Sequence, residues 1–308
     1  MAAPSIEARP GLARTRRREA LAGYGFLSPW LIGFFLLTAG PMIASLVLAF
    51  TDYNIFRAPR FVGVDNFVDL FNDPRFFAAW RVTLTYVLVA APLKMLASLL
   101  VAQLLAAPYR GQGFYRSAFY APSLVAASVS IALVWRAMFI DGGPVAQVLG
   151  FLGLPNQGWI GNPDMSIPLF VLLAVWAFGG PMVIFLAGLK QIPQDLYEAA
   201  DVDGAGGLRK WWHITLPMLS PTIFFNSLLE IIGSFMVFGS AFIISNGTGG
   251  PANSTLFYTL YLYQRAFTDL RLGYASAMAW AFFVVIGILT FIYFRLSRGW
   301  VFYAGDSR

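Results

Sequence analysis

The stretch IPLFVLLAVWAFGGPMVIFLAGL, residues 167–189, contains no charged residue. About 20 residues at a rise of 1.5 Å cross the hydrocarbon core of a bilayer, so this stretch predicts a membrane-spanning helix. It is continuously apolar, whereas the strands of a membrane barrel alternate between apolar and polar residues over about ten positions. The sequence therefore predicts an all-α membrane protein.

Five further stretches of the same kind bring the prediction to six transmembrane helices. Of the 308 residues, 58% are hydrophobic and only 12% are charged, about half the charged share of a soluble domain. A soluble fold of this size could not bury so much apolar surface. We predict a tail at 1–25, a six-span domain at 26–296 and a second tail at 297–308. The other predicted spans are 26–50, 80–105, 117–140, 220–245 and 274–294.

The basic residues indicate how the chain is oriented. With six spans both ends lie on one side, and that side carries thirteen Lys and Arg residues against six on the other. Loops rich in Lys and Arg stay in the cytoplasm, so we expect both termini there, in a bacterial or archaeal plasma membrane. The net charge of +6 then follows from topology, and no nucleic-acid partner is expected.

The chemistry of enzymes is missing from the sequence. There is no cysteine and a single histidine, His213, so neither a metal site nor a catalytic dyad is expected. No lysine closes a glycine-rich phosphate loop, so we expect no bound cofactor. If ATP drives this protein, ATP and Mg²⁺ belong to another chain.

The longest loop on the predicted cytoplasmic side reads QIPQDLYEAADVDGAGGLRKWWHITLP, residues 191–217. Asp195 is expected to cap a helix, and the Glu-Ala-Ala run favours that helix. Gly204 and the two glycines that follow it are expected to break the helix, and Pro217 to start the next span. The loop therefore predicts a helix-turn-helix at the membrane surface.

The spacing within this loop resembles the EAA loop of the inner-membrane subunits of binding-protein-dependent ABC importers. In that family the loop forms a coupling helix that docks on the ATPase subunit. The resemblance implies a type I transmembrane domain of an ABC importer. The open alternative is an amphipathic helix that rests on lipid headgroups. The matching residues are Glu198, Ala199, Ala200, Asp203, Gly204, Ile214, Leu216 and Pro217.

Further segments are similar to the carbohydrate branch of this family, which includes the maltose and glycerol-phosphate importers. The resemblance implies the permease subunit of an importer for a sugar or sugar-like solute. It implies a second homologous permease, two cytoplasmic ATPase subunits and an extracytoplasmic solute-binding protein as partners, all acting at the lipid bilayer. The alternatives are a permease of the same type for a phosphorylated polyol, and a secondary transporter. The similar segments are 61–76, 221–251, 253–280 and 298–305.

The resemblance to the maltose permease implies that the solute path lies between the spans on either side of the loop. Glycines there could equally serve close helix packing, and a tryptophan could serve an interface. The implied residues are Trp176, Phe178, Gly179, Gly180, Glu230, Ser234 and Gly239.

Two charged residues lie deep in the predicted spans. Counting along the second and fifth spans places Lys94 and Glu230 near the midplane. An ionisable group at this depth is costly and calls for a partner or a function. Three roles are open for the carboxylate: an ion pair with Lys94, a contact to hydroxyl groups of the solute, or a separate partner.

Overall fold

The computed structural model describes residues 11–107, 110–153 and 158–302, so the predicted tails lie partly outside the described residues. The predicted all-α membrane fold is confirmed. Within the described ranges five helices are long and apolar enough to cross a membrane, or up to six if one bent pair counts as a single span. The helices are α1 (Gly11–Phe34), α2 (Gly40–Leu48), α3 (Asp65–Asn72), α4 (Pro74–Ala106), α5 (Gln112–Val125), α6 (Val129–Phe139), α7 (Pro144–Phe151), α8 (Pro163–Trp176), α9 (Gly179–Lys190), α10 (Gln194–Val202), α11 (Gly207–Lys210), α12 (Leu216–Phe235), α13 (Gly239–Ile244), α14 (Tyr258–Tyr263) and α15 (Leu272–Ser297).

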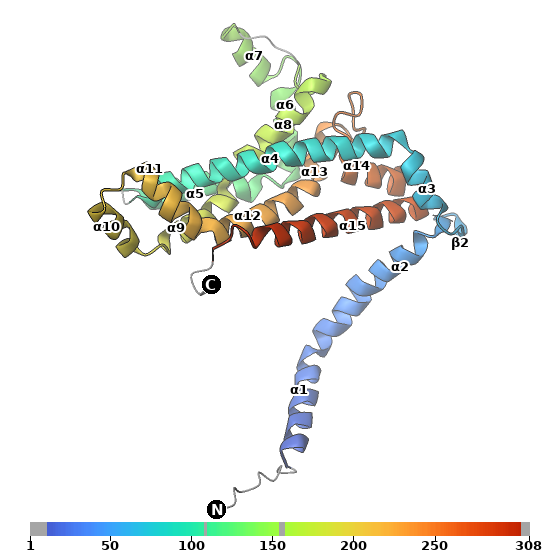
Figure 1. Ribbon diagram of the computed structural model, residues 1–308. Coiled ribbons are helices and arrows are strands. Elements are labelled where there is room, and N and C mark those ends of the chain that lie inside the picture. The colour runs from blue at the N-terminus through green and yellow to red at the C-terminus, as the bar shows by residue number, and fades with distance from the viewer. Residues whose placement is uncertain (1–10, 108–109, 154–157, 303–308) are drawn as a thin grey trace, which may run out of the picture.

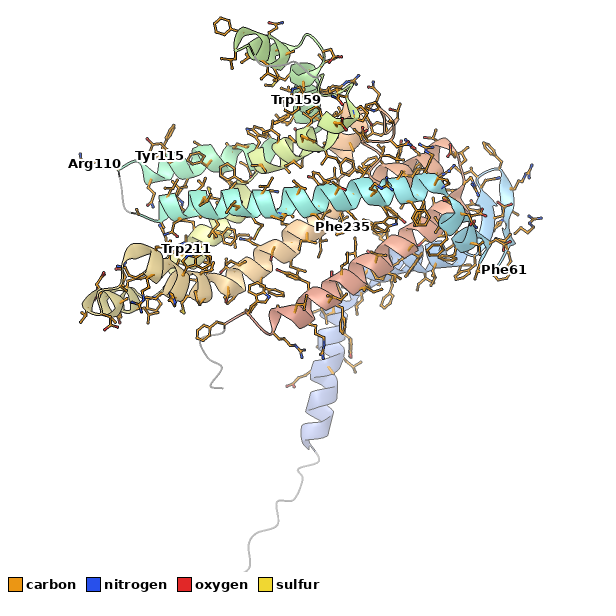
Figure 2. The ribbon with its side chains drawn as sticks, turned by 45° about the horizontal axis from the view of Figure 1, so that its top comes forward. Phe61, Arg110, Tyr115, Trp159, Trp211 and Phe235 are labelled. Carbon is orange, nitrogen blue, oxygen red and sulfur yellow. The ribbon has the colours of Figure 1, made fainter. Side chains whose placement is uncertain are left out.

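The bundle is elongated, with different elements at its two ends (Figure 1). At one end, here called the hairpin end, strands β1 (Thr51–Asn54) and β2 (Arg57–Phe61) pair antiparallel beside α3. At the other, the loop end, α10 and α11 connect α9 to α12. Figure 2 shows Phe61 at the hairpin end, Trp211 at the loop end and Phe235 between them.

The first span stands apart from the other helices. α1, the π-helical turn η1 (Phe35–Ala39) and α2 form one run that swings away from the bundle in Figure 1. The segment Glu19–Leu48 has the hydropathy of a span, yet its most apolar window buries no residue within this chain. Helix begins at Gly11 rather than near residue 26, so part of the predicted N-terminal tail is helical.

α4 is the central helix of the bundle. It packs against α8, α9 and α12, and the helix continues through Pro92. The buried face of α4 carries small residues such as Ala90, Ala91 and Ser98, which let neighbouring helices approach closely. These helices of the bundle are therefore organised around α4.

Three predicted spans are interrupted, which corrects the expectation of continuous helices. The predicted span 117–140 is divided between α5 and α6, and the apolar segment that qualifies as a span by length is Val129–Phe151. The span 167–189 is divided into α8 and α9, which meet at 45°. The span 220–245 is divided between α12 and α13.

Each interruption is stabilised by a side-chain hydroxyl. Pro181 lacks the N–H that would bond to the carbonyl of Ala177, and the Ser123 hydroxyl donates to that carbonyl instead, at 3.0 Å. Ser128 caps α6 by accepting from the Ile131 N–H at 3.3 Å. Thr259 donates to the carbonyl of Val237 between α12 and α13. Each break is thus held by a specific hydrogen bond and is not a frayed helix end.

The hairpin end is held by close backbone contacts. Asn66 donates to the carbonyl oxygens of Ala49 and Thr51, at 2.9 Å each. Gly273, in the first turn of α15, lies so close to β1 that an added Cβ atom would be 1.9 Å from the Thr51 carbonyl oxygen. Only glycine permits this approach of α15 to the hairpin.

Candidate functional site

The loop between α9 and α12 forms the predicted helix-turn-helix. α10 ends in a turn in which Ala205 N–H donates to Ala200 O at 2.9 Å and Gly204 N–H to Asp201 O at 3.0 Å. These two bonds define a Schellman motif, which needs a left-handed residue, and Gly204 supplies it with a φ of +71°. Asp195 lies in the first turn of α10 and does not cap it, because the helix begins one residue earlier, after Pro193.

One polar and one ionic contact join the two halves of the loop. The Tyr197 hydroxyl lies 2.8 Å from the Thr215 hydroxyl, in the π-helical turn η2 (Trp211–Thr215) that precedes α12. Lys210 pairs with Asp201 at 2.6 Å. α11, η2 and α12 then follow one another without a break.

The EAA-like residues fall into an exposed group and a packed group. Glu198, Ala199, Asp203 and Gly204 are exposed, and Ala200 is half-buried. Ile214, Leu216 and Pro217 are half-buried at the start of α12, where Ile214 packs against the core formed by α4, α9 and α12. The first group therefore presents a free surface, while the second anchors the loop to the fifth span.

A polar cavity of about 260 Å³ lies where the three interrupted spans meet. Its lining includes one residue from each interruption: Ala126, Ala177 and Val237. Irregular backbone at membrane depth is tolerated only where it is buried in protein or lines a wet cavity, and transporter sites form between such broken helices. This cavity is therefore the candidate solute site.

An ion pair stands on the cavity wall. Lys94 Nζ on α4 lies 2.9 Å from Glu230 Oε1 on α12, and both residues line the cavity. The two side chains are only 17% and 13% exposed. The first of the three roles left open by the sequence, pairing with Lys94, is therefore confirmed in geometry.

Two hydroxyl groups on the same wall have no partner among the described residues. Tyr86 on α4 and Ser234 on α12 are both buried and both line the cavity. Neither makes a hydrogen bond within the described part of the chain, and neither oxygen is sealed inside the protein. The alternative that Ser234 bonds back to its own helix is not seen, whereas Ser227, two turns earlier, does so at 2.6 Å.

The remaining residues of the predicted solute path lie outside the cavity wall. The Trp176 ring packs against Trp135 with centroids 5.8 Å apart, and Phe178 packs against Phe119 at 5.9 Å. A Cβ atom at Gly179 would lie 2.5 Å from the Phe119 carbonyl oxygen, so this glycine serves close packing of α9 on α5. Gly180 and Gly239 are likewise absent from the cavity lining.

The Gly180 N–H also helps to hold the break between α8 and α9. It donates to the Ser123 hydroxyl at 3.0 Å, while Ser98 on α4 donates to the Phe178 carbonyl at 2.9 Å. Lys94, Tyr86 and Ser240 line the cavity but were not assigned to the path from the sequence. An aromatic or a serine inside an apolar run resembles a packing residue, so the sequence offered no signal for Tyr86 or Ser240.

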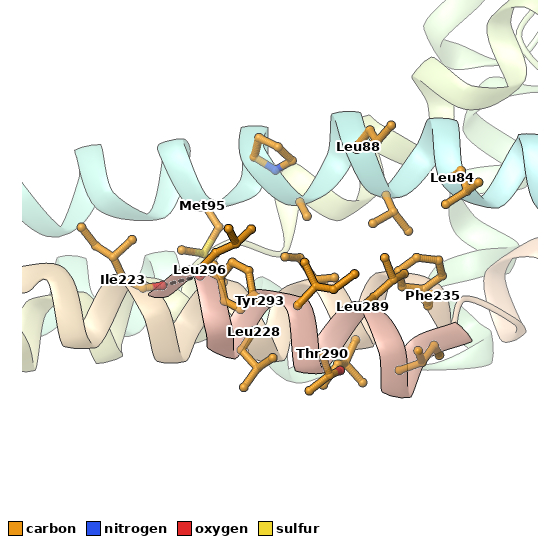
Figure 3. Close-up of a pocket in the computed structure, with 18 residues that line it drawn as sticks. Leu84, Leu88, Met95, Ile223, Leu228, Phe235, Leu289, Thr290, Tyr293 and Leu296 are labelled. Carbon is orange, nitrogen blue, oxygen red and sulfur yellow. Dashed lines mark hydrogen bonds between the residues drawn. The ribbon is translucent and has the colours of Figure 1, made fainter. Parts of the chain in front are cut away.

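A second, larger depression has a different character. It encloses about 500 Å³ between α4, α12 and α15, and almost all of its lining side chains are apolar (Figure 3). The lining has three polar side chains, Ser227, Thr290 and Tyr293. The hydroxyls of Ser227 and Tyr293 form a hydrogen bond with each other. This apolar groove offers no hydrogen-bonding group for a polar solute comparable to those of the cavity.

A third polar group, the Asp73 cluster, lies at the hairpin end and comprises Asp73, Arg75, Tyr261, Arg265 and Tyr274. Arg265 pairs with Asp73 at 3.1 Å, and the Tyr274 hydroxyl donates to it at 2.7 Å. Burial would raise the pKa of the Asp73 carboxyl, but the hydrogen bonds that it accepts outweigh burial, so its pKa lies below the ordinary value. The cluster ties α4 to α14 and α15.

The described ranges contain no candidate metal site. No group of three or more His, Asp or Glu side chains is arranged to hold a metal ion within those residues. The polar groups of the cavity are one cation, one carboxylate and several hydroxyls. Such a set can form hydrogen bonds with a polar solute.

Several known proteins are similar to this chain over nearly its whole length. It is 46% identical to Probable ABC transporter permease protein YesP of Bacillus subtilis (strain 168), covering 94% of this chain and 95% of that one. It is 30% identical to the Lactose transport system permease protein LacF of Rhizobium radiobacter, covering 92% and 98%. It is 31% identical to the Arabinooligosaccharides transport system permease protein AraP of Bacillus subtilis (strain 168), covering 96% and 94%.

Similarity extends to solved structures and to a family description. A chain of a bacterial alginate ABC transporter, solved in complex with an alginate pentasaccharide-bound periplasmic protein, has the same fold, with a TM-score of 0.80. The sequences are 24% identical, and the match covers 92% of this chain and 96% of that one. Residues 67–301 match the description "Binding-protein-dependent transport system inner membrane component". The chain therefore belongs to the family of inner-membrane components of binding-protein-dependent transport systems.

Proposed function

We propose that this chain is the permease subunit of an ATP-driven ABC importer that carries a sugar or sugar-like solute into the cytoplasm. The observation that carries the proposal is the polar cavity at the meeting point of three interrupted spans, in a chain of this family. Relatives named for lactose and for arabinooligosaccharides support a sugar over a phosphorylated polyol. The Lys94–Glu230 pair adds no net charge to the cavity, which also argues against a phosphorylated solute.

The assembly that we propose contains a second homologous permease, two cytoplasmic ATPase subunits and an extracytoplasmic solute-binding protein. ATP and Mg²⁺ act on the ATPase subunits, and this chain binds no cofactor and catalyses no reaction of its own. A periplasmic protein in the solved relative supports the binding-protein partner. Closure of the ATPase subunits would move the loop at 191–217, and the moving spans would open the cavity to one side at a time.

The docking surface that we propose is the exposed group of EAA-like residues around Gly204. The support for this proposal is that one part of the motif is exposed while the other is packed against the bundle. Residues that served only to pack the loop would not need to be exposed. Gly204 has open space around it, so a larger residue meets no clash within this chain and acts through its left-handed backbone or through a partner. Substitutions at this position can separate these two effects.

The test compares Gly204→Leu and Gly204→Asn with Gly207→Leu in the complex reconstituted with all its subunits. Asparagine tolerates the left-handed conformation better than leucine does, and Gly207 is exposed in the same loop without needing that conformation. Uptake and its coupling to ATP hydrolysis should be lost in Gly204→Leu, reduced in Gly204→Asn and retained in Gly207→Leu, with each permease still in the membrane. Unchanged uptake by Gly204→Leu would rule out docking through this surface.

We also propose that both termini lie in the cytoplasm. The support is the excess of Lys and Arg on the side that holds the loop at 191–217. A reporter fused after Arg308 should be active only in the cytoplasm, and one inserted near Asn156 only outside it. Activity of both reporters on the same side would contradict the six-span topology.

A further inference from the structure

Resting on the proposed function, we infer that Tyr86, Lys94 and Glu230 form a subsite that binds hydroxyl groups of the transported solute. The first step is the hydrogen-bonding capacity that these groups retain. Lys94 has three N–H donors, and within the described residues only Glu230 accepts from its ammonium group. Glu230 uses one of its two carboxylate oxygens for that bond. Tyr86 makes no hydrogen bond through its hydroxyl to any of the described residues.

The second step is that this unused capacity is concentrated in one place. Buried polar side chains in native proteins nearly always have partners, because each one left without a partner costs free energy. Tyr86 is only 5% exposed, yet it lines the cavity and lies within electrostatic range of Glu230. In the apolar groove, by contrast, Tyr293 and Ser227 bond to each other. The cavity therefore keeps its polar groups available for a ligand.

The third step concerns the ligand's chemistry. A hydroxyl group both donates and accepts hydrogen bonds, so it can donate one hydrogen bond to Glu230 and accept another from Lys94 at the same time. The opposite charges of the pair cancel, so a lone anion next to Lys94 would also meet the Glu230 carboxylate. The wall thus suits neighbouring hydroxyl groups on an uncharged face of a sugar ring.

The fourth step is that the subsite is rigid before any solute binds. The Tyr86 ring packs edge-on against Phe257, with centroids 5.2 Å apart, and Phe257 packs in turn against Phe170 at 5.0 Å. Lys94 stands on the same helix as Tyr86, two turns further along α4. A preorganised wall binds with less loss of side-chain entropy, which favours a specificity-determining role.

The test compares two substitutions that each remove one phenolic hydroxyl, Tyr86→Phe in the cavity and Tyr293→Phe in the apolar groove. The complex with all its subunits is reconstituted in lipid nanodiscs and proteoliposomes. Its melting temperature is measured without sugar and with lactose, arabinotriose or an alginate trisaccharide, and import of the same three probes is measured.

Without sugar, Tyr86→Phe should melt at the same temperature as the unmodified complex, because its hydroxyl has no hydrogen-bond partner to lose among the described residues. Tyr293→Phe should melt lower, because it leaves the Ser227 hydroxyl without its tyrosine partner. With the imported probe, Tyr86→Phe should need roughly threefold to tenfold more sugar for the same stabilisation and for half-maximal import. Tyr293→Phe should need the same concentration as the unmodified complex.

Equal sugar dependence in Tyr86→Phe and the unmodified complex would overturn the subsite while leaving the import function intact. Stabilisation by the alginate trisaccharide alone would also overturn it, because an anionic sugar would then be preferred. Failure of the unmodified complex to import any sugar would instead overturn the proposed function. These outcomes distinguish failure of the proposed subsite from failure of the proposed import function.

Discussion

Two ion pairs with nearly the same burial do different work in this protein. In the Asp73 cluster, Asp73 and Arg265 lie 3.1 Å apart, and their side chains are 14% and 19% exposed. In the cavity, Glu230 and Lys94 lie 2.9 Å apart, and their side chains are 13% and 17% exposed. Distance and burial alone would assign both pairs the same role.

The difference lies in how many other donors each carboxylate has. Asp73 also accepts from the hydroxyls of Tyr261 and Tyr274 and from the Arg75 N–H. Among the described residues Glu230 accepts only from Lys94. A saturated carboxylate fixes neighbouring helices, whereas an unsaturated one on a cavity wall can still bind a ligand. The number of hydrogen bonds that the carboxylate accepts, rather than burial, is therefore what distinguishes the Asp73 pair from the Glu230 pair.

The largest loss of stability should come from removing the Asp73 carboxylate from the Asp73 cluster. Asp73→Ala removes the cap of α4 and takes from Arg265 the more buried of its two carboxylate partners, leaving only Asp269, which should lower the free energy of unfolding by about 3 kcal/mol. The control is Asp69→Ala, which breaks the exposed pair with Arg271 at 3.1 Å and should cost less than about 1 kcal/mol. Thermal unfolding in nanodiscs measures both, and equal losses would contradict the structural role of the cluster.

A substitution next to the cluster tests how tightly the hairpin end is packed. Gly273→Ala places a Cβ atom against the Thr51 carbonyl, which should force the backbone apart and destabilise the protein by about 2 kcal/mol. Gly287→Ala, in the same helix with no atom within 4 Å of the new Cβ, should be neutral or stabilising. The melting temperatures of the two variants would converge if α15 could shift freely away from β1.

The unsaturated pair should respond with a small loss of stability and a large loss of transport. Glu230→Gln keeps the shape and should cost about 1 kcal/mol, because Lys94 faces a cavity in which a counter-ion or water can approach. Expression should persist while import falls at least tenfold. A merely structural pair would instead lose folded protein in Glu230→Gln and regain it in the double variant Lys94→Met with Glu230→Gln.

The smallest effect is expected from acid. Because the folded pKa of Asp73 is lowered, the stability that it contributes is present above its ordinary pKa of about 4 and is lost as pH falls through the lowered value. The melting temperature of the unmodified protein should therefore fall more steeply below pH 4 than that of Asp73→Asn. Parallel curves for the two proteins would show that the carboxylate is not ionised preferentially in the folded state.

The sequence predicted which segments cross the membrane but not where they break. A run of apolar residues shows no boundary at 177–178, because that break depends on Pro181 together with Ser98 and Ser123 from other helices. The turn at Gly204 was predictable, since a left-handed helix end requires a local residue type. The start of α10 was misjudged by two residues, since the N-cap is Pro193 rather than Asp195, and both residue types favour a helix start.

The candidate site was predicted in part for a similar reason. The Lys94–Glu230 pair could be anticipated because charges are rare at membrane depth and helical rise places them at equal height. Tyr86 was missed because its unbonded hydroxyl is a property of its surroundings. Trp176 and Gly179 were assigned to the path, yet the packing around α5 and α6 takes them away from the cavity wall.

The uninterrupted succession of α11, η2 and α12 makes one rod that joins the loop end to the cavity. Glu230 lies 23 residues beyond Gly207, so the rod is roughly 35 Å long at the helical rise. A partner that tilts the loop would act on a long lever arm, and the carboxylate would swing with it while Lys94, on α4, stayed behind. Spin labels at the exposed residues Leu208 and Leu229, which both lie within the rod, should then keep one separation throughout the transport cycle, and a separation that changed would mean that the rod bends between them.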